Sequence, residues 1–130
     1  RKQKKDFSCD IETRYGIPAL GTIASAANAD ILVADIEQLM LNNKGVAFVA
    51  VNSDKNFANS LKEIMCKLET KADYIGCIVD DINAIIRISS FDNFILVVSD
   101  EGIDISENAR KTISKLERLD KKILGCVNIG

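Results

Sequence analysis

Val46-Ala47-Phe48-Val49-Ala50-Val51 is an uninterrupted run of apolar residues, with Gly45 before it and Asn52 after it. A short run rich in β-branched residues and bounded by turn residues is typical of a strand that is buried on both faces. From residue 57 the apolar residues recur at every third or fourth position, which places them on one face of a helix over 57–68. These residues are Phe57, Leu61, Ile64, Met65 and Leu68. A buried strand followed by an amphipathic helix predicts a strand–helix–strand unit and a parallel sheet.

The same alternation continues to the end of the chain. Three further runs have the length and composition of buried strands: Ile75–Val79, Phe94–Val98 and Ile123–Val127. Helical spacing predicts a helix over 30–42, a short one over 81–89 and another over 109–119. The sequence therefore predicts an α/β protein, a three-layer α/β/α sandwich around a small, mostly parallel sheet of Rossmann-like or P-loop-like type.

One domain accounts for this pattern, over residues 29–130. A chain of 130 residues, 47% of them hydrophobic, has the size of a single core. Residues 1–28 are less regular and contain the only proline, Pro18. We expect them to form a leader that lies along the domain and adds a short edge strand near Leu20–Ala24. No apolar run reaches the roughly 20 residues that cross a bilayer, so we expect this part of the protein to be soluble.

Positive charge is concentrated at the start of the chain, in Arg1-Lys2-Gln3-Lys4-Lys5. Removing these four charges from the formal net charge of −2 leaves about −6 on residues 6–130. Because nucleic acids require a basic surface, we expect no nucleic-acid partner. The basic start has two interpretations. It is either a solvated terminus or a juxtamembrane stretch on the cytoplasmic side of a membrane helix upstream of Arg1, where Lys and Arg are enriched.

The cysteine and histidine content restricts the possible chemistry. Cys9, Cys66, Cys77 and Cys126 form no C-x-x-C pair, and we expect them to be reduced packing residues of a cytosolic protein. The chain has no histidine. This removes the usual metal ligand and general base, so neither a zinc site nor a Ser-His or Cys-His nucleophile is expected.

The turn after the first strand is where nucleotide-binding α/β domains hold phosphate. Backbone N–H groups close on the phosphate there, which requires glycines together with a Lys and a Ser or Thr. This chain has Asn52-Ser53-Asp54-Lys55-Asn56 instead, without a glycine. Asp54 is a suitable N-cap for the following helix, and it places a carboxylate where the helix dipole would otherwise attract phosphate. We therefore expect a degenerate phosphate loop and no cofactor.

Acidic residues after the predicted strands form a weaker alternative site. Parallel sheets bind ligands at the carboxyl ends of their strands, where carboxylates can hold a metal ion or act as a general base. The residues at these positions are Asp54, Asp80, Asp81, Asp100 and Glu101. Asp81 is also placed to cap the short helix over 81–89, and we favour this second role.

Two segments carry recognisable signatures. Tyr15-Gly16-Ile17-Pro18-Ala19-Leu20-Gly21-Thr22-Ile23 resembles the stretch that follows the second transmembrane helix in polysaccharide chain-length determinant proteins and in bacterial tyrosine kinases of capsule assembly. Phe91–Val98, the helix after it and Lys122-Ile123-Leu124-Gly125-Cys126-Val127-Asn128 are similar to the last third of that kinase domain. There, an Asp precedes a hydrophobic-Val-Val strand, and a Lys-hydrophobic-Leu-Gly-x-Val-Asn strand ends the core.

The chain departs from this family where the family's activity resides. Lys55 has neither a Gly before it nor a Ser or Thr after it, so it does not match the phosphate-binding lysine. The Glu-x-x-Arg-x-x-Arg pattern of kinase ring assembly is missing; the nearest register gives Ala34, Glu37 and Met40. In place of a C-terminal tyrosine cluster, the chain has only Tyr15 and Tyr74, for which we favour structural roles.

The resemblance and these departures together imply a non-catalytic domain related to the capsule tyrosine kinases. It would belong to a membrane-anchored protein of capsular or exopolysaccharide biosynthesis, on the cytoplasmic side of the cell membrane. It would control chain length by contact with a protein partner, either a capsule tyrosine kinase or further copies of itself. One alternative is a nucleotide- or metal-binding enzyme that uses the acidic strand ends. Another is a freestanding receiver or ligand-sensing module, for which the residues upstream of Arg1 are the test.

Overall fold

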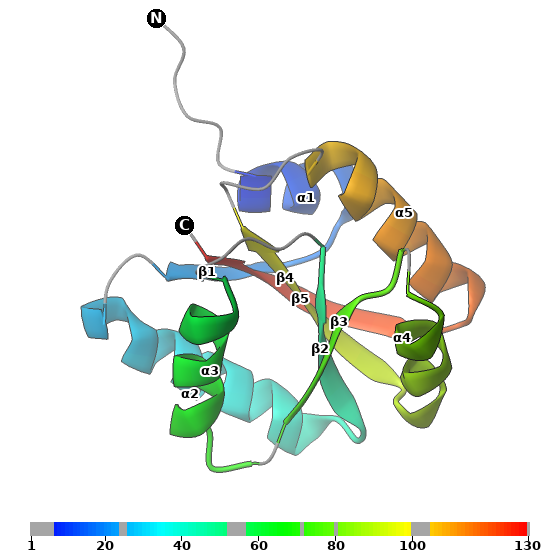
Figure 1. Cartoon of the computed structure of the whole chain (residues 1–130). Helices are drawn as coiled ribbons and strands as arrows, with labels where there is room; N and C mark the ends of the chain where they lie inside the picture. The colour runs from blue at the N-terminus through cyan, green and yellow to red at the C-terminus, as the bar shows by residue number, and fades with distance from the viewer. Residues whose placement is uncertain are drawn as a thin grey trace, which may run out of the picture.

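The computed structural model describes residues 7–23, 26–51, 57–70, 72–79, 81–99 and 105–129. Helices and strands alternate along the chain (Figure 1). The strands are β1 (Ala19–Ile23), β2 (Val46–Ala50), β3 (Asp73–Cys77), β4 (Asn93–Ser99) and β5 (Lys122–Ile129). The helices are α1 (Phe7–Tyr15), α2 (Ala26–Asn42), α3 (Phe57–Lys67), α4 (Ile82–Arg87) with the 3-10 turn Ile88–Ser90, and α5 (Ile105–Arg118).

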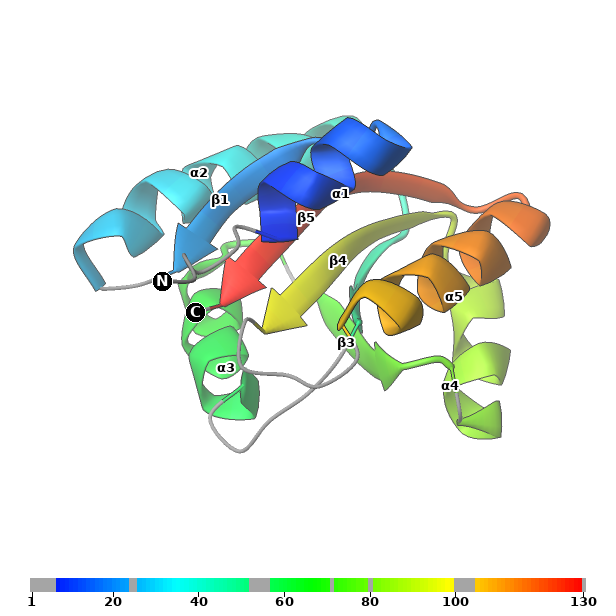
Figure 2. The same ribbon diagram turned by 90° about the horizontal axis from the view of Figure 1, so that it is seen from above.

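The strands form one parallel sheet in the order β1-β5-β4-β2-β3. β2 lies between two neighbours, because Phe48 pairs with Ile95 of β4 on one side and with Tyr74 of β3 on the other. Seen from above, the arrowheads of β1, β5 and β4 point the same way (Figure 2). The predicted α/β fold with a parallel sheet is thus confirmed.

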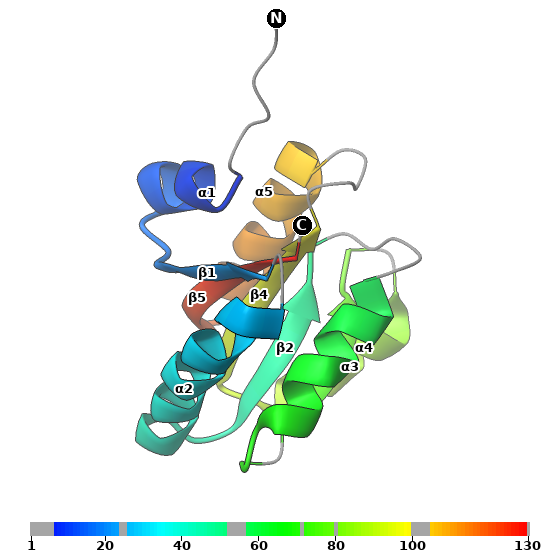
Figure 3. The same ribbon diagram turned by 90° about the vertical axis from the view of Figure 1, so that its left-hand side faces the viewer.

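Helices cover both faces of this sheet. α2 and α3 lie on one face, where Figure 3 shows them beside each other, and α1, α4 and α5 pack on the other face. Phe48 belongs to the core under α2 and α3, and Phe94 belongs to the core under α4 and α5; both are at most 1% exposed. Because both faces are covered, every residue of β2 is buried, which explains its uninterrupted apolar sequence.

The N-terminal segment contributes to this sheet and core. β1 is the edge strand next to β5 and begins one residue before the predicted range Leu20–Ala24. The backbone N–H of Cys126 donates to the carbonyl of Pro18 at 2.9 Å, and Ile11 of α1 is fully buried. Helix α1 was not predicted, although Phe7, Ile11 and Tyr15 have the four-residue spacing of one helix face, because the segment is short and polar overall. Within the described ranges, no helix is both long and apolar enough to span a membrane.

The cysteines differ in how far their side chains are buried. Cys126 is buried and Cys77 is half-buried, as expected for packing residues. The prediction was wrong for Cys66, which is exposed on α3. Its position lies off the helix face formed by Leu61 and Ile64, so helical periodicity turns it to solvent. The side chain of Cys9 lies outside the described part of the chain.

Candidate functional site

The carboxyl ends of the strands meet at one edge of the sheet, where the sequence predicted the candidate sites. Most of those residues lie outside the described part of the chain: Asn52, Ser53, Asp54, Lys55, Asn56, Asp80, Asp100 and Glu101. Only Asp81 of the predicted set is described.

Asp81 caps helix α4. Its backbone is extended, with φ −117° and ψ 110°, and its Oδ1 accepts hydrogen bonds from the N–H groups of Asn83 at 2.9 Å and Ala84 at 3.4 Å. These N–H groups have no partner within the helix, which is why Asp is favoured at this position. The predicted capping role is confirmed, and one carboxylate oxygen is engaged in it.

Asn128 is a second polar residue near this edge, in β5. It lies opposite Val98 of β4 and Thr22 of β1, and it is 2% exposed. Its Oδ1 accepts no hydrogen bond from the described residues. A buried oxygen without a donor costs about 1–3 kcal/mol of lost hydration. The sequence identified Asn128 only as the end of a recognisable strand, because burial cannot be inferred from one polar residue.

The described residues offer little general acid–base or metal chemistry. They contain no group of three or more His, Cys, Asp or Glu side chains that could hold a metal ion. Burial raises the pKa of the Tyr74 phenol to about 12, and the nearby Cys77 acts in the same direction. Tyr74 is therefore neutral at physiological pH and packs against the core under α2 and α3.

Helix α4 exposes two isoleucines. The short helix over 81–89 was predicted from the spacing of Ile82, Ile85 and Ile86. Only Ile85 of the three packs against the core, whereas Ile82 is 73% exposed and Ile86 is 64% exposed. The buried positions are instead Ala84 and the following Ile88. Because successive residues are rotated by 100°, a helix that buries Ala84 and Ile88 directs Ile82 and Ile86 away from the core. We call Ile82 and Ile86 the α4 isoleucine pair.

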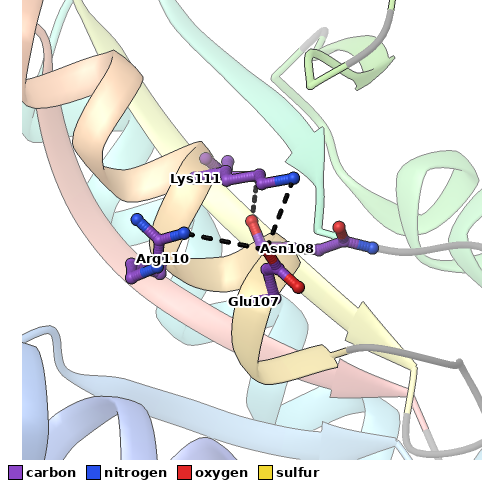
Figure 4. Close-up of polar contacts among 5 residues, drawn as sticks. Glu107, Asn108, Arg110 and Lys111 are labelled. Carbon is purple, nitrogen blue, oxygen red and sulfur yellow. Dashed lines mark hydrogen bonds and ion pairs between the residues drawn. The ribbon is translucent and has the colours of Figure 1, made fainter.

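Helix α5, on the same face of the sheet, carries a basic groove. A hollow of about 210 Å³ is lined by Arg110, Lys111, Ser114, Lys115 and Arg118 of α5, together with Val79, two residues after the end of β3. Glu107 lies 3.8 Å from Arg110 and 3.6 Å from Lys111 (Figure 4). Lys115 and Arg118 form no ion pair with any residue that the structure describes.

The sequence analysis did not identify this α5 basic groove. The net acidity of residues 6–130 directed attention to carboxylates at the strand ends. The available indication was the spacing of the four cations, at positions i, i+1, i+5 and i+8 from Arg110 in a predicted helix. This spacing places them along one side of the helix.

Comparisons with protein-family models, with curated proteins and with solved structures give no match to this chain.

Proposed function

We propose that this is a non-catalytic contact domain of a membrane-anchored protein of capsular or exopolysaccharide biosynthesis. It acts on the cytoplasmic side of the cell membrane and controls polysaccharide chain length. Its partner there is a protein, either a capsule tyrosine kinase or further copies of the same chain.

The α4 isoleucine pair is the observation that carries this proposal. Ile82 and Ile86 lie one turn apart on a helix that Asp81 caps at its start and that a 3-10 turn closes at its end. Removing an isoleucine side chain from water stabilises a complex by about 1.5–3 kcal/mol. Two such residues on a fixed helix therefore form a suitable centre for a protein contact.

The arrangement of the two recognisable segments supports the link to capsule assembly. β1 belongs to the leader signature and β5 to the kinase-like signature, and they are paired neighbours in the sheet. Gly125 of β5 leaves room for Leu20 of β1, because a Cβ at Gly125 would lie 2.6 Å from the Leu20 Cγ. Parts of the two signatures thus pack directly against each other.

The chemistry of the described residues supports a non-catalytic role. Asp81, from the alternative acidic site, uses its carboxylate to cap α4. Tyr74 remains protonated because burial raises its pKa to about 12.

A chain-length measurement tests the proposal. Ile82→Ser and Ile86→Ser, introduced together into the full-length protein in its source organism, should change the length distribution of the surface polysaccharide at unchanged protein level. A matched control is Ile31→Ser with Leu41→Ser, which also alters two exposed apolar residues but on α2. An unchanged distribution in the α4 variant, or the same change in both variants, contradicts the proposal.

Calorimetry tests the absence of catalysis separately. Titration of the chain with ATP and Mg²⁺ should give no binding in the micromolar range, because the strand-end turn has no glycine and carries Asp54. Micromolar binding would favour the alternative of a nucleotide-binding enzyme.

A further inference from the structure

The α5 basic groove is positively charged, whereas residues 6–130 as a whole carry a net negative charge. Residues 6–130 carry about −6 in total, yet the described residues that line the groove include four cations and no acidic residue. Arg110 and Lys111 are paired with one carboxylate, that of Glu107. The described groups at the groove therefore leave an excess of positive charge.

Helix stability does not account for this arrangement. Lys115 and Arg118 lie in the last turn of α5, where positive charge favours the helix dipole. Arg110 and Lys111 lie nearer the first turn, where the dipole does not favour cations. The dipole would thus explain only half of the cations, and the exposed pairs of Arg110 and Lys111 with Glu107 add at most about 0.5 kcal/mol each to the helix.

The groove provides hydrogen-bond donors on two rows. Arg110, Ser114 and Arg118 follow one another at four-residue intervals, and Lys111 and Lys115 form a parallel row. The rows extend over eight residues, or about 12 Å of helix. Arginine and lysine only donate, and the serine hydroxyl can donate as well. A ligand that matches them is rich in acceptors and carries more than one negative charge.

Phosphate meets these requirements better than a carboxylate. A phosphate group has three or more acceptor oxygens and close to two negative charges, and it forms bidentate contacts with arginine. The hollow of about 210 Å³ is smaller than the roughly 300–1,000 Å³ of sites for drug-sized ligands, which suits one or two phosphate groups. Val79 supplies an apolar wall for the group that bears them.

We propose that the α5 basic groove binds a phosphate-bearing ligand, with Lys115 and Arg118 as its principal cations and Ser114 as a hydroxyl donor between the two rows. Its described lining shares no residue with the turn at 52–56 or with the α4 isoleucine pair. It does not depend on the function proposed above.

Titration calorimetry with inorganic pyrophosphate at low ionic strength tests this site. The chain should bind pyrophosphate, and the double variant Lys115→Gln, Arg118→Gln should bind it at least about tenfold more weakly, because two charge-assisted contacts are lost. The matched control is Lys62→Gln with Lys67→Gln, which removes the same charge from a hollow on α3 that also contains Glu63. The control should bind like the unmodified chain. Circular dichroism checks that all variants are folded.

Three results would overturn the proposal. They are no binding by the unmodified chain, equal weakening in the α5 and α3 variants, and tighter binding of a glutamate peptide of the same charge. The last result would assign the groove to an acidic protein segment.

A vesicle-binding measurement distinguishes a lipid headgroup from a soluble ligand as the source of the phosphate. Binding to vesicles that contain phosphatidic acid, in competition with pyrophosphate, supports the proposal with a lipid headgroup as the ligand. Binding of pyrophosphate without binding of vesicles supports it with a soluble ligand.

Discussion

The helices on the two faces of the sheet differ in the polar contacts that link them to each other. On one face, Glu37 of α2 accepts hydrogen bonds at 3.0 Å from both the backbone N–H and the hydroxyl of Thr70, just after α3. An ion pair of 3.4 Å between Lys67 and Asp30 also joins α3 to α2. On the other face, no hydrogen bond or ion pair joins α4 to α5 among the residues that the structure describes.

This difference indicates which helices have exposed side chains available for contacts with other molecules. Both layers bury a continuous core against the same sheet, so polar links between helices are not needed for folding. Where the links are absent, the exposed side chains remain available for other contacts. The α4 isoleucine pair and the α5 basic groove both lie in the layer of α4 and α5, which we call the open layer. The layer of α2 and α3 is the closed layer.

The largest loss of unfolding free energy is expected at a buried residue of α5. Leu116 of α5 is fully buried, and Leu116→Ala should lower the free energy of unfolding by about 2–5 kcal/mol, because it removes packed methyl groups and leaves a cavity. Ile86→Ala on α4 should change it by no more than about 0.5 kcal/mol, because Ile86 is exposed. Urea unfolding of both variants measures the contrast, and equal losses would show that α4 buries its isoleucines.

A smaller effect is expected at the start of α4. Asp81→Ala removes the acceptor of two helix N–H groups and should cost about 1 kcal/mol of unfolding free energy. Asp81→Asn retains the capping oxygen and should restore most of this stability. If Asp81→Asn were as unstable as Asp81→Ala, charge and not capping would be the role of this residue.

The closed layer should respond to acid through Glu37. Hydrogen bonds from the backbone and hydroxyl of Thr70 hold the pKa of Glu37 below its ordinary value of 4.5. A lowered pKa in the folded state stabilises the fold above the unfolded pKa, and the contribution is lost as pH falls through the folded pKa. Glu37→Gln should therefore lower the melting temperature at neutral pH and flatten its decline below pH 4.5. Glu63→Gln, which removes one carboxylate from an exposed position of α3, is the control.

Only a small effect on stability is expected at Glu107. Its pairs with Arg110 and Lys111 are exposed and longer than 3.5 Å, so Glu107→Gln should change the free energy of unfolding by less than about 1 kcal/mol. The same variant should bind pyrophosphate more tightly, because both cations lose a competing carboxylate. Unchanged or weaker binding would show that Arg110 and Lys111 do not face the ligand.

Most of the helices were predicted from an apolar face of helical period, and the strands from uninterrupted apolar runs. The helix over 57–68 and the strand at Val46–Val51 are found within one residue of their predicted ends. The strand at Ile75–Val79 is shifted to Asp73–Cys77, because pairing with β2 sets its limits. Helix α1 is short and polar overall, with an apolar stripe of only Phe7, Ile11 and Tyr15, so its packing reveals it more clearly than its sequence does.

The candidate sites were harder to predict than the fold. The sequence indicated the capping role of Asp81, because an Asp directly before a helical pattern can be recognised as an N-cap from the neighbouring residues alone. It did not indicate the α5 basic groove, which requires Val79 to lie beside α5 although more than 30 residues separate them. It also predicted α4 from Ile82, Ile85 and Ile86 without indicating that only Ile85 of the three packs against the core.

The sequence by itself determined the α/β alternation, the parallel sheet and the cap of α4. These depend on local spacing and on residues that contact their neighbours along the chain. Only the tertiary structure decided which side of α4 is buried, that the N-terminal segment pairs with β5, and that the cations of α5 surround a hollow. Each of these depends on contacts between residues far apart in the chain, and the spacing within one segment contains no information about them.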